Sequence, residues 1–161
     1  MLRIAEKFTE LDFEQLMGVY VEGNQENAEY FGMTIQEAER SFGEYLRESF
    51  FPQSGAVYCI WEMDGCYQAA LRLEPYGDGL LMEALETKPE SRRRGYARSL
   101  ILAVQAWLRE RENPKVYSHV SKRNQASLGV HRACGFQKLL DCAEYVDGTV
   151  STNAVTLCWQ A

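Results

Sequence analysis

Four arginines surround one glycine in a short segment, and this combination suits the binding of an anion. The segment spans residues 87–100, reads TKPESRRRGYARSL, and carries its glycine at position 95. We expect a strand to end before it and a helix to begin near Gly95. A helix N-terminus presents unpaired N–H groups and a partial positive charge, and glycine lets a ligand approach the backbone closely. The segment therefore predicts a phosphate-type anion site. A solvated basic turn that caps a helix would carry the same residues.

The segment differs from two common phosphate-binding loops. It lacks the Gly-Lys-Ser/Thr ending of a P-loop. It also lacks the first of the three glycines of the dinucleotide-binding fingerprint, and several other strands precede it. The pattern alone therefore leaves the ligand open, and a nucleotide-binding regulator that uses the arginines is one alternative.

Two blocks of the sequence resemble those of the GNAT superfamily of acyl-CoA-dependent N-acyltransferases. Residues 92–97, RRRGYA, resemble the superfamily's Arg/Gln-x-x-Gly-x-Gly/Ala pyrophosphate loop, and residues 85–90, LETKPE, resemble the strand that approaches it. Residues 124–136 resemble the superfamily's Asn-led helix that ends in Gly-Phe. One long helix and one strand fit between the two blocks, as the resemblance requires.

The resemblance implies a donor and assigns residues to it. Acetyl-CoA is the expected acyl donor, and no metal is expected. The strand before the loop would pair its backbone with the pantetheine arm near Leu85 and Thr87. Asn124 would hydrogen-bond the cofactor, although Asn is also a favoured N-cap residue. The loop residues that would hold the CoA pyrophosphate or flank it are Arg92, Arg93, Arg94, Gly95, Ala97 and Arg98.

Acetyl transfer to an amine needs a base for the ammonium proton and a proton for the departing thiolate. His131 occupies a position where many members of the superfamily carry a tyrosine that protonates the thiolate, and imidazole titrates in a suitable range. It could also be a polar surface residue. For the base we expect Glu83, which shares a face with Leu85 and Thr87 if the strand alternates cleanly. Glu86 would then point to the opposite face, and a bulge would exchange the two assignments.

Charge is divided unevenly along the chain, whose formal net charge is −6. Residues 1–90 hold 6 Lys and Arg against 18 Asp and Glu, and residues 91–161 hold 11 against 5. A basic second half suits the CoA phosphates, and an acidic first half suits a cationic acceptor. We expect the acceptor, a primary amine of a small molecule or a peptide, to meet Tyr30 and Phe31 between the first two helices. Neither a nucleic acid nor a membrane is an expected partner.

Length and composition favour one globular unit. The chain has 161 residues, of which 46% are hydrophobic and 25% charged, so we expect a single GNAT acetyltransferase domain over residues 1–161. No apolar run approaches the roughly 20 residues of a membrane span. The N-terminus lacks an apolar signal segment, and the five cysteines form no CxxC pair. We therefore expect a cytoplasmic protein with reduced thiols, as a monomer or homodimer.

The elements that position these residues follow the order β-α-α-β-β-β-α-β-α-β-β. This order predicts a mixed α/β fold, with a central mixed, largely antiparallel sheet of about seven strands flanked by four helices. The turn at Asp64-Gly65 should join two strands as a hairpin. We expect the last two strands, 136–146 and 154–159, to flank the turn at Asp147-Gly148.

Capping signals place the helices. Asp12 with Gln15 opens the first helix, which Gly23 and the polar run 24–27 should end. Thr34 with Glu37 opens the second. The helix from Gly95 to about Arg111 should stop at Asn113-Pro114, and a short helix over 124–134 should close at Gly135.

Two classes of function remain open at this stage. One is an N-acetyltransferase that moves the acetyl group directly in a ternary complex. The other is a non-catalytic acyl-CoA-binding GNAT-fold sensor or structural subunit. The arginine loop and Asn124 fit both, whereas His131 and a carboxylate on the strand over 80–87 favour the enzyme.

Overall fold

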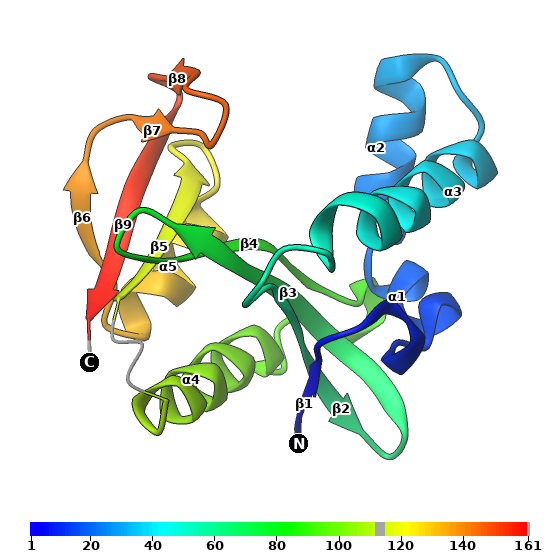
Figure 1. Ribbon diagram of the computed structural model, residues 1–161, viewed down its shortest axis with the longest axis horizontal. Coiled ribbons are helices and arrows are strands. Elements are labelled where there is room, and N and C mark those ends of the chain that lie inside the picture. Colours follow the sequence, from blue (N-terminus) through cyan, green and yellow to red (C-terminus); the bar gives the residue numbers. More distant parts are fainter. Residues whose placement is uncertain (112–114, 161) are drawn as a thin grey trace.

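Seven strands form one sheet in the computed structural model, which describes residues 1–111 and 115–160 (Figure 1). The order of the strands is β1-β2-β3-β4-β5-β9-β6. The pairing of β4 with β5 is parallel, and the other neighbouring pairs are antiparallel. The predicted largely antiparallel sheet is confirmed. Its strands are β1 (Leu2–Ala5), β2 (Val57–Met63), β3 (Cys66–Tyr76), β4 (Gly79–Thr87), β5 (Lys115–Ser121), β6 (Gln137–Leu140) and β9 (Ala154–Gln160).

Five α-helices occur in the described part of the chain, one more than expected. They are α1 (Phe13–Val19), α2 (Val21–Phe31), α3 (Ile35–Tyr45), α4 (Tyr96–Arg109) and α5 (Gln125–Ala133). No described helix has both the length and the apolarity needed to cross a membrane.

The extra helix arises because the chain turns at Tyr20, not at the polar run. The predicted break at Gly23 and residues 24–27 is wrong, since these residues lie inside α2. Asn24 is buried there, and its amide contacts the sulfur of Met17 at 3.4 Å. The helix ends instead at Gly32, which has a left-handed φ of 64°.

Local capping and turn signals are confirmed where the structure describes them. The carboxylate of Asp12 accepts a bond from the backbone N–H of Gln15 at 3.1 Å, and Thr34 with Glu37 forms a capping box. Asp64 and Gly65 both have positive φ, as a type I′ hairpin turn requires. The predicted stop at residues 113–114 lies outside the described residues.

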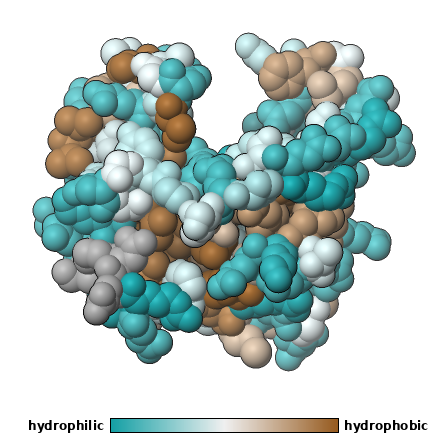
Figure 2. Space-filling view, in the orientation of Figure 1, coloured by the Kyte–Doolittle hydropathy of each residue, from teal (hydrophilic) through white to brown (hydrophobic). Residues whose placement is uncertain are grey.

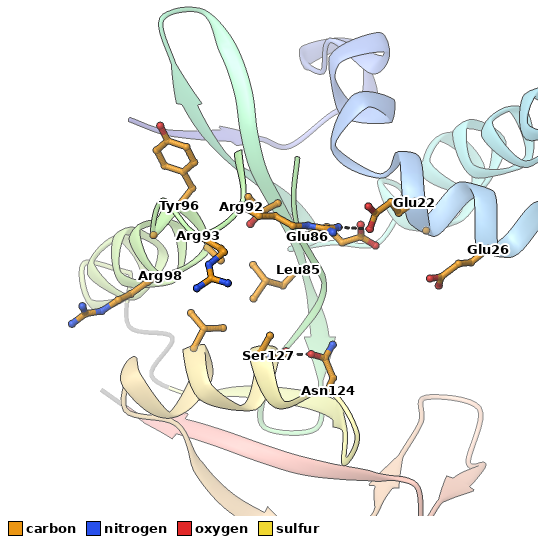
Figure 3. Close-up of a pocket in the computed structure, with 16 residues that line it drawn as sticks. Glu22, Glu26, Leu85, Glu86, Arg92, Arg93, Tyr96, Arg98, Asn124 and Ser127 are labelled. Carbon is orange, nitrogen blue, oxygen red and sulfur yellow. Dashed lines mark hydrogen bonds and ion pairs between the residues drawn. The ribbon is translucent and has the colours of Figure 1, made fainter. Parts of the chain in front are cut away.

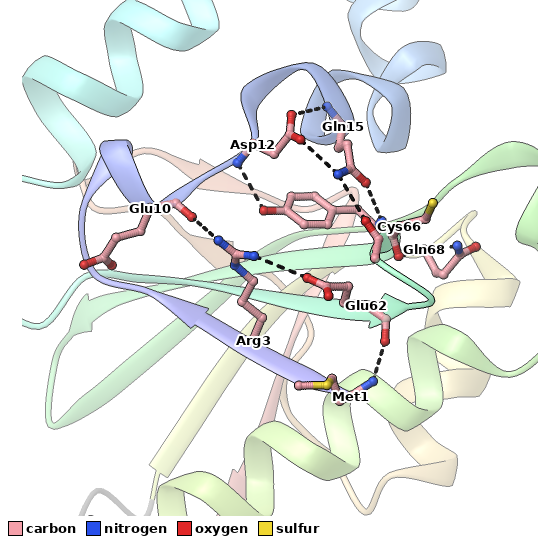
Figure 4. Close-up of polar contacts among 10 residues, drawn as sticks. Met1, Arg3, Glu10, Asp12, Gln15, Glu62, Cys66 and Gln68 are labelled. Carbon is pink, nitrogen blue, oxygen red and sulfur yellow. Dashed lines mark hydrogen bonds and ion pairs between the residues drawn. The ribbon is translucent and has the colours of Figure 1, made fainter.

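Polar contacts attach α1 to the tip of the β2–β3 hairpin (Figure 4). Gln15 donates to the carbonyl of Gly65 at 3.2 Å and accepts from the N–H of Tyr67 at 2.9 Å. The N–H of Asp12 donates to the hydroxyl of Tyr67 at 3.1 Å. These bonds fix the position of α1, and therefore the start of α2, against the sheet.

The C-terminal region contains a small separate hairpin. β7 (Ala143–Glu144) pairs with β8 (Val150–Ser151) around the Asp147-Gly148 turn, whereas β6 pairs with β9 in the main sheet. The expected strand over 154–159 is confirmed as β9, but the expected continuous strand over 136–146 is wrong, because that segment divides into β6 and β7. The chain leaves the main sheet near Cys142, whose carbonyl accepts a bond from the Thr156 hydroxyl at 2.7 Å.

The sheet separates two apolar cores. Leu100, Ile101, Val104 and Leu108 of α4 pack on one face. On the other face, side chains of α1 pack against residues of β2 and β3, including Tyr58 and Ala70. Figure 1 shows α4 on one side of the sheet and α1–α3 on the other.

The sheet opens at its centre. Pairing between β4 and β5 covers Leu80–Met82 and Val116–Ser118. Both strands continue beyond that pairing, to Thr87 and Ser121. Residues of β4 and β5 beyond the pairing line a small cavity of about 190 Å³ together with residues of α5. The gap between the two strands is where the candidate site lies.

Candidate active site

A cleft of about 700 Å³ opens where β4, α2, α5 and the N-terminus of α4 meet (Figure 3). Most residues that the sequence assigned to CoA line it. The exception is Arg94, which is exposed and lies outside the lining. The assigned residues that line the cleft are Leu85, Thr87, Arg92, Arg93, Gly95, Ala97, Arg98 and Asn124.

The N-terminus of α4 lacks a side-chain cap. Gly95 occupies the N-cap with a φ of 82°, and its carbonyl accepts the first helical bond from the N–H of Ser99 at 2.9 Å. The N–H groups of the first turn therefore have no partner inside the helix. A Cβ on Gly95 would meet only open space. Backbone donors, neighbouring arginines and this open space together fit a pyrophosphate.

One of these arginines is already paired. Arg92 forms an ion pair with Glu22 of α2, with 2.6 Å between Nη2 and Oε2, and both side chains are about half exposed. Figure 3 shows the pair across the cleft from Arg98. The contact joins the anion loop to the helix that borders the other end of the cleft.

A bulge in β4 changes the predicted faces of its two glutamates. Arg72 of β3 pairs with Glu83, and Ala70 pairs with Glu86. Two residues of β4, Ala84 and Leu85, therefore stand opposite one residue of β3, and Ala84 has a φ of 51°. The expectation that Glu83 shares the face of Leu85 and Thr87 is wrong, because the bulge adds one residue. Glu83 and Glu86 lie on the same face of the sheet, the face that α1 covers.

Glu86 lies at the junction of the main cleft and a cavity of about 330 Å³ beside α2 and α3. It also lines the cavity of about 190 Å³ between β4 and β5. Burial raises the pKa of its carboxyl to about 7; Arg92 opposes the rise, and the charges of Glu26 and Glu22 add to it. Gly23 makes this arrangement possible, since a Cβ there would lie 2.8 Å from Oε1 of Glu86.

Glu83, by contrast, is held in an ion pair. Its Oε2 accepts bonds from Nη2 of Arg72 at 3.0 Å and from Nε at 3.2 Å. The Arg72 guanidinium lies 5.1 Å from the centre of the Tyr45 ring. Burial, together with a hydrogen bond to Glu83, raises the pKa of the neighbouring Glu74. These contacts hold the Glu83 carboxylate against Arg72, outside the lining of the main cleft.

His131 is buried behind the cleft surface. It is 1% exposed, its Nδ1 lies 2.7 Å from the carbonyl of Ser127, and its Nε2 lies 3.0 Å from the hydroxyl of Ser118. Because the carbonyl can only accept, Nδ1 carries the hydrogen and Nε2 accepts. Burial lowers the pKa of the ring. The Ser127 hydroxyl, 3.3 Å from Nδ1, connects the ring to the cleft, since Ser127 lines it.

Asn124 both caps α5 and lines the cleft, as the sequence suggested. Its Oδ1 accepts a bond from the N–H of Ser127 at 3.0 Å, which caps α5, and the residue lines the cleft. The side-chain amide nitrogen is a donor that the cap does not use. The capping interaction therefore leaves Asn124 able to bind a ligand.

The predicted acceptor residues lie away from the cleft. Tyr30 and Phe31 are 84% and 65% exposed near the end of α2, and their ring centres are 4.9 Å apart. The first turns of α2 border the cleft instead, through Glu22, Gly23 and Glu26. The four-residue spacing of the two glutamates is a signal that could have located this face. In Figure 2 the surface is hollowed between α2–α3 and the β7–β8 hairpin.

Comparison with known protein families identifies the family of this chain. A model described as the acetyltransferase (GNAT) family matches residues 22–136, more than half of the chain. The protein therefore belongs to the GNAT family of acetyltransferases. No curated protein sequence matches the chain.

Solved structures of low sequence identity share the fold. The PaiA N-acetyltransferase of Thermoplasma acidophilum, in complex with coenzyme A, has a TM-score of 0.66 at 13% identity, covering 100% of this chain and 99% of that one. The ribosomal-protein-S18-alanine N-acetyltransferase of Escherichia coli has 0.65 at 15%, covering 99% and 94%. An aminoglycoside 6'-acetyltransferase type Ii has 0.71 at 8%, covering 99% and 96%.

Proposed function

We propose that this GNAT protein transfers the acetyl group of acetyl-CoA to a primary amine of a small molecule or peptide. Transfer would be direct, within a complex of donor, acceptor and protein. The observation that carries the proposal is the position of Glu86, a carboxyl with a pKa of about 7 at the junction of the two cavities. One continuous sheet joins the N- and C-terminal parts of the described chain, which supports a single domain over residues 1–161.

The donor would bind along the main cleft. Its pyrophosphate would accept bonds from the N–H groups at the start of α4, and Arg93 and Arg98 would add charge. The exposed Arg94 would contribute mainly long-range attraction. Leu85 and Thr87 would offer backbone groups, and Asn124 its side-chain amide. The thioester of the bound donor supplies the acetyl group.

Glu86 would act as the general base for the acceptor. An alkylammonium has no free electron pair, so its nitrogen must lose a proton before it can attack the thioester carbon. The Glu86 carboxylate would accept that proton before the attack. The neutral amine then forms the C–N bond as the C–S bond breaks, and the nitrogen loses a second proton, which balances the proton that the thiolate gains. A carboxyl with a pKa near 7 is substantially ionised at neutral pH and basic enough to accept the proton. Glu83 stays available as a second candidate, but its pairing with Arg72 disfavours it.

The departing thiolate must also gain a proton. We propose that His131 assists through Ser127, whose hydroxyl lies between the ring and the cleft. Because the pKa of His131 is lowered, the ring is largely neutral near pH 7. Its main contribution would then be to hold the Ser127 hydroxyl, which donates a hydrogen bond toward the sulfur.

The acceptor would approach from the side of α2. Glu22 and Glu26 border the cleft there, and α2 contains three acidic residues and no basic residue. Such a field attracts an ammonium and repels an anionic acceptor. We therefore expect cationic amines to be better acceptors than acidic amino acids.

A release assay tests the proposal. Purified protein is mixed with acetyl-CoA and a panel that contains polyamines, aminoglycosides, basic peptides and glutamate, and free CoA is measured. The expected result is acceptor-dependent CoA release with the cationic amines. Binding of acetyl-CoA without release for any amine would instead support a non-catalytic acyl-CoA-binding protein. Release driven best by glutamate would contradict the proposed acceptor class.

A further inference from the structure

Tyr20 lies between α1 and α2, and its hydroxyl reaches β4. The residue is 4% exposed, and its hydroxyl donates to the carbonyl oxygen of Ala84 at 2.7 Å. The hydroxyl of Tyr58 in β2 donates to the Tyr20 oxygen at 3.0 Å. Because a carbonyl can only accept, the direction of this chain of bonds runs from Tyr58 to Tyr20 to Ala84. Burial raises the pKa of Tyr20 well above its usual range, so the hydroxyl keeps its proton.

The acceptor of this bond is the bulged residue itself. Ala84 has a φ of 51°, a left-handed conformation that non-glycine residues adopt at a cost. A bulge also takes backbone groups out of the regular ladder. A partly buried carbonyl without a partner would be unfavourable, and the Tyr20 hydroxyl supplies that partner.

The bulge determines where Glu86 points. With it, Glu86 pairs with Ala70, on the face of the sheet that α1 covers. Without the extra residue, strict alternation would move Glu86 to the other face, which packs against α4. The position of Glu86 between the two cavities therefore depends on the backbone of Ala84.

We propose that Tyr20 is a positioning residue, which holds the bulge at Ala84 and thereby keeps Glu86 in the cleft. The proposal rests on the proposed role of Glu86 as the base. Tyr20 acts through the backbone of β4 and not through contact with the reacting atoms.

Paired Phe substitutions test this role. Tyr20→Phe removes the bond to Ala84, and Tyr58→Phe removes a hydroxyl from the same buried pair but leaves that bond in place. We expect Tyr20→Phe to lower kcat about tenfold, the scale of one lost hydrogen bond, and Tyr58→Phe to lower it about twofold or less. CoA affinity, which depends mainly on the arginine loop, should change less than about threefold in both. Equal losses of kcat in the two variants would overturn the proposal.

A second substitution separates positioning from general packing. Glycine adopts the left-handed conformation without steric cost, so Ala84→Gly should restore most of kcat when added to Tyr20→Phe. In the otherwise unchanged protein the same substitution should alter kcat little. If Ala84→Gly has the same effect in both backgrounds, Tyr20 does not act through the bulge.

An NMR titration of the Glu86 carboxyl gives a readout that needs no acceptor. The resonance, assigned by its loss in Glu86→Gln, should titrate near pH 7 in the native protein. In Tyr20→Phe it should move toward the ordinary value of 4.5, and Ala84→Gly should return it. An unchanged Glu86 pKa in folded Tyr20→Phe would overturn the positioning role. A protein that shows the shift but acetylates no amine would refute the proposed function alone.

Discussion

The guanidinium of Arg92 lies 2.6 Å from the carboxylate of Glu22, so an ion pair joins the anion loop to α2. A phosphate that binds at this loop must share Arg92 with Glu22 or displace it. An exposed pair of this kind has a small stabilising effect of its own. Its main consequence is competition between a protein carboxylate and the donor for one cation.

Removing this competitor should strengthen CoA binding. Glu22→Gln frees Arg92, and we expect the Kd for CoA to fall about two- to fivefold at low salt, which matches the energy of an exposed ion pair. Calorimetry with CoA measures the change. Glu29→Gln is the matched control, because it removes the same charge from the same helix outside the cleft lining. Identical affinities of the two variants would show that Glu22 does not compete.

A negative charge at position 95 should weaken binding of the CoA donor. The space beside Gly95 is open, and its φ of 82° is tolerated by Asn and Asp better than by most residues. We expect Gly95→Asp to weaken CoA binding at least about tenfold, because a carboxylate would face the pyrophosphate. Gly95→Asn has nearly the same shape without the charge and should bind more tightly than Gly95→Asp. Unchanged CoA affinity in a folded Gly95→Asp protein would refute the proposed pyrophosphate site.

The pH dependence of turnover should follow Glu86. A base works only as the carboxylate, so kcat at saturating acceptor should rise as the pH increases through about 7 and then level off. Glu86→Gln should lower kcat by about 10²–10⁴-fold and remove this limb, while CoA affinity stays within a few fold. Glu90→Gln, a change at an exposed residue paired with Lys88, serves as the control. Retention of the limb in Glu86→Gln would point to another base, with Glu83→Gln as the next variant.

A side chain at position 23 should lower activity without disrupting the fold. A Cβ there would come within 2.8 Å of the Glu86 carboxylate, which can move aside because it ends a flexible side chain. We expect Gly23→Ala to keep the fold and to lower kcat about tenfold or more by displacing the base. Gly129→Ala is a useful control, since it is also a helical glycine but its Cβ would meet open space. It should preserve kcat and stabilise the protein by up to about 1 kcal/mol. Full activity of Gly23→Ala would separate the glycine from the position of Glu86.

His131 and Ser127 should act on the same step. If the ring holds the Ser127 hydroxyl toward the departing sulfur, Ser127→Ala and His131→Asn should each lower kcat by about tenfold or more. The double variant should then lose little beyond the larger single effect, because coupled residues are not additive. CoA affinity and circular dichroism report on binding and folding. A kcat unchanged by His131→Asn between about pH 6 and pH 9 would leave His131 with a structural role.

The local parts of the site could be predicted from the sequence. Short segments of the sequence are enough to recognise Gly95, the surrounding arginines and Asn124, because a helix start and its cap are local features. The same holds for the capping box at Thr34 and the hairpin turn at Asp64. These signals predicted the starts of two helices, one hairpin turn and the place of the anion loop.

The orientation of the glutamates depended on distant residues. Nothing in the sequence around Ala84 marks a bulge, since an alanine with positive φ has no characteristic neighbours. The bulge depends on a hydrogen bond from Tyr20, 64 positions away. The course of α2 was missed for a related reason: the polar run 24–27 resembles a loop, but Asn24 is buried by tertiary packing. Long-range contacts of this kind override local preference.

The gap between β4 and β5 also has a mechanical consequence. A three-residue parallel pairing, Leu80–Met82 with Val116–Ser118, is the ladder that links β1–β4 to β5, β9 and β6. A ligand whose arm carries amide groups could form hydrogen bonds with β4 beyond the end of its pairing with β5. Such a ligand would add a link between the β1–β4 part of the sheet and the part formed by β5, β9 and β6. Backbone amides of β4 that lie after Met82 and point away from β3 would then exchange with deuterium quickly in the free protein and slowly with CoA bound. Donor binding would therefore reduce the motion of the two parts of the sheet relative to each other.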